Sequence, residues 1–194
     1  GELRPDAPKM CSEFWSGWFD KWGARHETRD AKDMVAGLDE MLSKGISFSL
    51  YMTHGGTSFG HWAGANSPGF APDVTSYDYD APINESGQTP PKYFELRQMM
   101  QKYTQGKMPN VPKAAAPTMN VAKFTLDQYA TIGSGIDSTA TSVTPLTFED
   151  MDFGWGSMIY RTALPEAPAG AVLTIDGAHD YVQVYLNKKY VGKI

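Results

Sequence analysis

The stretch from residue 30 to residue 52, DAKDMVAGLDEMLSKGISFSLYM, decides the fold of this chain. Asp30 is typical of a helix N-cap and Gly45 of a helix end, so residues 31–44 are predicted to be helical. The apolar residues of this segment recur at helical spacing: Met34, Val35, Leu38, Met41 and Leu42. Residues 46–52 follow as a predicted strand.

Elements on both sides extend this pattern. Lys9–Ser12 reads as a short buried strand that ends at Glu13, and residues 53–89 form a long loop rich in Gly, Asn, Ser and Pro. Pro90 and Pro91 open a second helix that runs to about Gln105. The order strand, helix, strand, helix fits the last two units of a (β/α)8 TIM barrel, whose chemistry lies at the carboxyl ends of the strands.

The second half of the chain has a different character. Residues 106–119, with three prolines and three consecutive alanines, are predicted to be a linker between residues 1–105 and 120–194. After the linker, strands are expected at 158–161 and 171–175, followed by a hairpin of 181–186 and 190–194 around 187–189. The chain starts at Gly1 without signal-peptide features and stops inside this hairpin, so we expect a fragment of a longer polypeptide with a truncated β domain.

Composition excludes several function classes. The net charge of −5, without a basic stripe, disfavours a nucleic-acid partner. The longest nearly apolar run, Ile46–Met52, is too short to span a bilayer, and the single Cys11 excludes an internal disulfide. The four histidines form no metal-ligand pattern, so no metal and no cofactor are expected. The oligomeric state is not determined by the sequence.

A carboxylate among aromatic residues marks the candidate site. Residues 12–23 read SEFWSGWFDKWG, and Glu13 stands at the end of the predicted strand. Aromatic rings stack on the C–H face of a pyranose, and a carboxylate can act at the anomeric carbon, so this combination favours a sugar site. Asp78 and Asp80, on either side of Tyr79, are predicted to fix a loop through hydrogen bonds.

Three stretches together carry a family resemblance: residues 12–23, residues 51–60 (YMTHGGTSFG) and residues 75–82 (TSYDYDAP). They resemble glycoside hydrolase family 35, the β-galactosidases, and the sequence of the first stretch is most similar to the Bacteroides-like bacterial branch. The resemblance implies a retaining exo-β-galactosidase acting on β-galactoside oligosaccharides or glycoconjugates, with Glu13 as the nucleophile. It implies that Tyr51 lies near the nucleophile and that Tyr79 contacts the sugar. Trp15 is a third substrate-binding candidate, at a position where the lysosomal relatives have a tyrosine.

The resemblance also implies what this chain lacks. The family's acid/base glutamate follows an asparagine on an earlier barrel strand, and the one Asn-Glu pair here, Asn84-Glu85, does not match that motif. We therefore expect the acid/base outside this chain and the fragment alone to be inactive. Residues from 120 onward resemble the start of a jelly-roll-like β-sandwich domain. The usual location of the family's members implies that this protein is exported, either periplasmic or extracellular, or lysosomal if it is eukaryotic.

Two other functions stay open on the sequence. An exo-β-glucosaminidase could use the same scaffold, because contacts to the 2-substituent of the sugar come partly from strands outside this chain. A non-catalytic carbohydrate-binding protein is the competing class, since sandwich domains often bind glycans. Such a module has no need for a carboxylate at the end of a barrel strand, so Glu13 discriminates between the two classes.

Overall fold

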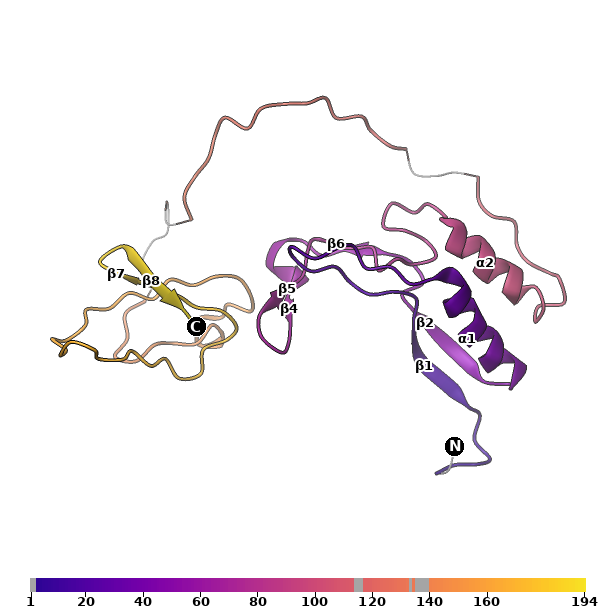
Figure 1. Cartoon of the computed structure of the whole chain (residues 1–194), viewed down its shortest axis with the longest axis horizontal. Helices are drawn as coiled ribbons and strands as arrows, with labels where there is room; N and C mark the ends of the chain where they lie inside the picture. Colours follow the sequence, from indigo (N-terminus) through magenta and orange to yellow (C-terminus); the bar gives the residue numbers. More distant parts are fainter. Residues whose placement is uncertain (1–2, 114–116, 133, 135–139) are drawn as a thin grey trace. The chain divides into compact units, whose positions relative to one another are not determined.

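The computed structural model describes residues 3–113, 117–132, 134 and 140–194. The chain divides into two compact units, residues 1–119 and residues 120–194. The first unit contains strands β1 (Met10–Trp15) and β2 (Ser47–Tyr51) with helices α1 (Ala31–Ser43) and α2 (Pro91–Met100), as Figure 1 shows. Short strands lie along the chain between β2 and α2.

β1 and β2 pair in parallel, with α1 as the connection between them. The side chain of Asp30 accepts a hydrogen bond from the backbone N–H of Lys32 at 2.7 Å, and Gly45 has a φ of 67°, which confirms both predicted helix ends. β1 differs from the prediction because it continues to Trp15, so that Glu13 lies within the strand. Most β1 side chains are also exposed, since the helices cover only one face of this pair.

The core of the first unit lies between this pair and the two helices. Met34 and Leu38 of α1 are fully buried, and Met99 of α2 is 2% exposed. Partly buried apolar side chains from both strands and both helices pack around them: Phe14, Val35, Leu42, Phe48, Leu50, Leu96 and Met100. Phe14 and Leu50 pack against the helices, and successive side chains of a strand point to opposite faces. The residues directly before and after Phe14 and Leu50 therefore lie on the face away from the helices.

α2 begins at the predicted prolines but ends at Met100, before the expected end near Gln105. Turns follow, and Gln105 and Gly106 have φ values of 53° and 74°. The hydroxyl of Tyr103 donates to Asp39 Oδ1 of α1 at 2.6 Å, so this turn is bonded to α1 without continuing the helix.

The segment between β2 and α2 is more regular than the plain loop that was predicted. β3 (Gly56–Thr57) pairs antiparallel with β6 (Ser76–Tyr77), and β4 (Ala65–Asn66) pairs antiparallel with β5 (Ala71–Pro72). A short 3₁₀ helix, η1 (Gly60–Ala63), lies between these pairs in the sequence. Two-residue strands are too short to produce a periodic signal, which explains why the sequence did not indicate them.

The second unit contains the predicted hairpin. β7 (Gln183–Leu186) and β8 (Lys189–Lys193) pair antiparallel, and the two turn residues Asn187 and Lys188 have φ values of 51° and 66°, as in a type I′ turn. A 3₁₀ helix, η2 (Glu149–Met151), lies earlier in the unit. The strands predicted at 158–161 and 171–175 are wrong, because neither segment has a pairing partner among the described residues. The described parts of the chain also contain no helix with the length and hydropathy of a membrane span.

Candidate active site

Glu13 lies at an irregularity in β1. The pairing passes from Cys11 with Phe48 to Phe14 with Leu50, so that β1 advances by one residue more than β2. This extra residue is a β-bulge, a feature that redirects side chains and is frequent beside active sites. The Glu13 side chain lies in the bulge and is exposed. The local departure from regular pairing therefore falls at the predicted nucleophile.

Trp15 fixes one oxygen of this carboxylate. Its indole Nε1–H donates a hydrogen bond to Glu13 Oε1 at 2.7 Å. Trp15 also stands opposite Tyr51 in the pairing of β1 with β2, and the two residues are 47% and 38% exposed. The structure thus brings together three of the residues that the sequence indicated, on the face of the pair that the helices leave open.

Tyr79 is the centre of an aromatic cluster beside these residues. Its ring lies 5.4 Å from the ring of Tyr51, edge to face, and 5.4 Å from that of Tyr77, stacked. The rings of Trp18 and Phe19 lie 6.1 Å and 6.3 Å away. Only 2% of Tyr79 is exposed, so any contact with a sugar is confined to an edge of its side chain. Its predicted role as a sugar contact stays a prediction.

Two phenols of this cluster, those of Tyr77 and Tyr79, have raised pKa values. Burial raises the pKa of Tyr79 to about 12, and electrostatic interactions with Tyr51 and Glu13 act in the same direction. Burial, followed by a hydrogen bond with Tyr51, also raises the pKa of Tyr77. The hydroxyls of Tyr51 and Tyr77 lie 3.0 Å apart, so Tyr51 forms a hydrogen bond with Tyr77.

Tyr79 lies in a stretch of left-handed backbone. Tyr79 and Asp80 have φ values of 61° and 48°, and this left-handed conformation costs roughly 1–2 kcal/mol for each non-glycine residue. Gly17 allows the loop to lie against the end of β1, because a Cβ there would be 2.0 Å from the Tyr79 carbonyl oxygen. Asp80 Oδ2 accepts from the backbone N–H of Arg29 at 2.7 Å and from Lys92 Nζ at 2.5 Å, which confirms its predicted loop-fixing role.

Glu85 has a different environment from Glu13. Its two carboxylate oxygens accept hydrogen bonds from the hydroxyls of Thr57 on β3 and Ser76 on β6. Its backbone N–H donates to Asp78 Oδ1 at 2.9 Å, so Asp78 also fixes the loop as predicted. This carboxylate joins two short strands, β3 and β6.

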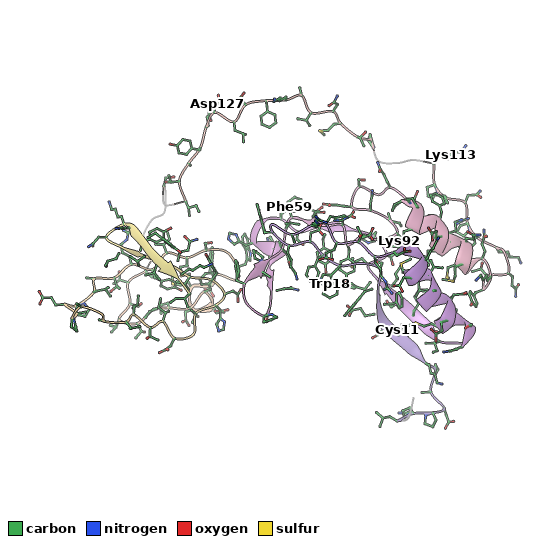
Figure 2. The ribbon with its side chains drawn as sticks, viewed as in Figure 1. Cys11, Trp18, Phe59, Lys92, Lys113 and Asp127 are labelled. Carbon is green, nitrogen blue, oxygen red and sulfur yellow. The ribbon has the colours of Figure 1, made fainter. Side chains whose placement is uncertain are left out.

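Two cationic residues at the site were missed. Arg29 donates from Nη1 to the Trp15 carbonyl oxygen, and its guanidinium lies 5.0 Å from the centre of the Phe14 ring. Lys92, labelled in Figure 2, is buried at the start of α2. The sequence gives no periodic or motif signal for either contact, since both depend on segments that are distant in the chain. Among the described residues, no group of three or more His, Cys, Asp or Glu is arranged to hold a metal ion.

Comparison with known proteins supports a common origin. Residues 1–103 match glycosyl hydrolases family 35, and residues 145–194 match beta-galactosidase, first all-beta domain. Beta-galactosidase of Homo sapiens is 39% identical over 192 residues, covering 94% of this chain and 28% of that protein. Beta-galactosidase-1-like protein of Mus musculus is 39% identical over 194 residues, covering 94% and 30%. Beta-galactosidase of Xanthomonas manihotis is 34% identical over 198 residues, covering 100% and 33%.

The chain therefore spans about a third or less of the length of these relatives. The two matches follow each other in the predicted order, the end of a barrel and then a β domain. The relatives include animal and bacterial proteins, so the expected bacterial branch stays a prediction. Because the first match extends over more than half of the 194 residues, the chain belongs to glycosyl hydrolases family 35.

Proposed function

We propose that the full-length protein containing this chain is a retaining exo-β-galactosidase in which Glu13 is the nucleophile. The observation that carries this proposal is the exposed Glu13 carboxylate in the β1 bulge, held by the indole N–H of Trp15 on the same side as Tyr51. Relatives named Beta-galactosidase, at 34–39% identity, support galactose as the sugar.

The chemistry is a double displacement. A carboxylate oxygen of Glu13 attacks the anomeric carbon, and the bond from that carbon to the leaving oxygen breaks. A second carboxylic acid gives its proton to the leaving oxygen, then takes a proton from the water that attacks the glycosyl-enzyme and frees Glu13. The two carboxyl groups of a retaining enzyme lie about 5–5.5 Å apart.

The second carboxyl group is proposed to lie outside this chain. Glu85, the one glutamate that follows an asparagine, is engaged by hydroxyls of β3 and β6. The isolated chain is therefore proposed to be inactive. Its organisation is proposed to be a barrel segment over residues 1–105, a linker over 106–119 and the start of a jelly-roll-like domain over 120–194.

The aromatic residues around Glu13 are proposed to bind the sugar. Trp15 positions the nucleophile and offers its indole face as a wall, and Tyr51 offers a hydroxyl beside the same face. Tyr79 is proposed to touch the sugar at its edge and to support the ring of Tyr51.

The substrate is proposed to be a terminal β-linked galactose of an oligosaccharide or glycoconjugate, and the protein is proposed to be exported.

Replacement of Glu13 in the full-length protein tests the proposal. Glu13→Gln should lower kcat on an aryl β-galactoside by more than about a thousandfold, since a lost nucleophile is among the most costly of catalytic changes. In Glu13→Gly, azide should enter the space and restore turnover, with α-galactosyl azide as the product. Glu40→Gln, which alters an exposed carboxylate on α1, is the matched control.

The outcome separates the competing functions. Full activity of Glu13→Gln would show that another group is the nucleophile. Turnover of aryl β-glucosaminides in preference to galactosides would favour the glucosaminidase. Sugar binding without turnover of either by the unaltered protein would favour a carbohydrate-binding module.

A further inference from the structure

Lys92 is a buried cation whose hydrogen-bonding capacity is used in full. Its side chain is 7% exposed, and a buried ammonium group requires charged or polar partners. Nζ donates to three oxygen atoms: the Ser16 carbonyl at 3.0 Å, the Asp80 carbonyl at 2.7 Å and Asp80 Oδ2 at 2.5 Å. An ammonium group has three N–H donors, so each of them has an acceptor.

The partners of Lys92 belong to the two segments that form the candidate site. Ser16 follows Trp15 at the end of β1, and its backbone N–H donates to the Tyr51 carbonyl at 3.0 Å. The hydroxyl of Ser16 donates to the Met52 carbonyl at 2.7 Å, so the ends of β1 and β2 are joined at this residue. Lys92 thus connects these strand ends to the loop of Asp80, which is far from them in the sequence.

The bonds that Lys92 forms with the loop of Asp80 restrain the position of Tyr79. Tyr79 and Asp80 both have positive φ, a conformation that persists only where the surroundings hold it. Lys92 binds both the backbone and the side chain of Asp80, and the backbone N–H of Arg29 binds the same Oδ2. The bonds of Lys92 therefore restrain the residue directly after Tyr79.

We propose that Lys92 is a positioning residue that sets the place of the nucleophile strand relative to the tyrosine loop. It touches neither Glu13 nor the sugar, and acts through the Ser16 carbonyl and Asp80. A buried ion pair is weak support for stability, because apolar residues of similar volume often replace one without loss. The geometry that the pair fixes can therefore be measured separately from the stability of the fold. This inference rests on the proposed function of Glu13.

The experiment uses variants of the full-length protein. Lys92→Met removes the three donors and keeps a similar volume, and Lys92→Met combined with Asp80→Asn also removes the buried charge that the first change leaves unpaired. Lys102→Met is the matched control, since this lysine forms an exposed ion pair with Asp39 away from the site. The readouts are kcat and KM on an aryl β-galactoside, the rate of Glu13 labelling by a 2-fluoro-galactosyl donor, and the melting temperature.

A displaced strand end should slow chemistry more than binding. We expect kcat and the labelling rate to fall about a hundredfold in both Lys92 variants, the size of effect that a displacement near 1 Å produces, with KM changed less than about threefold. The double variant should melt closer to the unaltered protein than the single variant and still be slow. Lys102→Met should stay within about twofold in each rate.

Other outcomes overturn the inference. A folded double variant with unaltered kcat and labelling rate would reduce Lys92 to a packing role. Failure of both Lys92 variants to fold would make this lysine a requirement of the fold and not of the site. If the unaltered protein neither turns over galactosides nor is labelled at Glu13, the proposed function fails first; an active, labelled protein with unaffected variants contradicts this inference alone.

Discussion

Gly17→Ala tests the contact between the nucleophile strand and the tyrosine loop. A Cβ at residue 17 would lie 2.0 Å from the carbonyl oxygen of Tyr79, 2.9 Å from its carbonyl carbon and 3.0 Å from Cβ of Asp80. The closest of these distances must open to at least 3.0 Å, a movement of about 1 Å. The two nearest atoms belong to the backbone of a restrained loop, so a flexible side chain cannot absorb the movement.

The size of the expected effect follows from this displacement. Forcing extra volume into a well-packed contact typically lowers the free energy of unfolding by about 1–3 kcal/mol. Misplacement of site groups by about 1 Å can lower kcat about a hundredfold, and we expect a loss of that order on an aryl β-galactoside. Thermal unfolding and steady-state kinetics of the full-length protein measure the two effects.

Gly56→Ala is the matched control for this prediction. A Cβ at Gly56 meets no atom within 4 Å, and Gly56 does not have a positive φ, so both the melting temperature and kcat should stay close to those of the unaltered protein. The reasoning is refuted if Gly17→Ala and Gly56→Ala behave alike in stability and in rate.

Three further predictions concern individual side chains. Trp15→Phe removes the 2.7 Å hydrogen bond to Glu13 and should lower kcat about tenfold, since bonds to charged groups contribute about 1.5–3 kcal/mol; an unchanged kcat would show that this bond is not used. The hydrogen bond that the His26 ring donates to the Asp20 carboxylate raises the pKa of His26, so His26 stabilises the fold below its usual pKa of 6.5 and this stabilisation is lost as pH rises through the raised value. His26→Gln should therefore lower the melting temperature more at about pH 5.5 than at about pH 8.5, and an equal effect at both would contradict the assignment. Glu85→Gln should lower the melting temperature and leave kcat within about threefold, whereas a thousandfold loss of kcat would identify Glu85 as the acid/base.

The parts of the fold that carry strong local signals were predictable. The Asp30 cap, the apolar face of α1 and the φ of 67° at Gly45 each follow from residue chemistry within one turn of the helix. The hairpin turn at Asn187 and Lys188 is equally local. The end of α2 was not predictable, because the bonds of Tyr103 to Asp39 depend on how the two helices pack.

The residues of the candidate site were more predictable from the sequence than the contacts between them. The clustering of Glu13, Trp15, Tyr51 and Tyr79 follows from their places near the carboxyl ends of two neighbouring parallel strands and in the loop that follows the second strand. Their partners do not follow, since the bond between Tyr51 and Tyr77 and the burial of Tyr79 depend on the left-handed turn of the loop. Lys92 gives no signal in the sequence, because its acceptors lie 76 and 12 residues away.

The most direct test of the central claim is covalent trapping of the nucleophile. The full-length protein is treated with a 2-fluoro-galactosyl donor, which forms the glycosyl-enzyme and hydrolyses slowly, and the labelled peptide is identified by mass spectrometry. The account predicts a single fluorogalactosyl group on the Glu13 carboxylate. A label on a different carboxylate, or no label on a folded protein that hydrolyses galactosides, would contradict it.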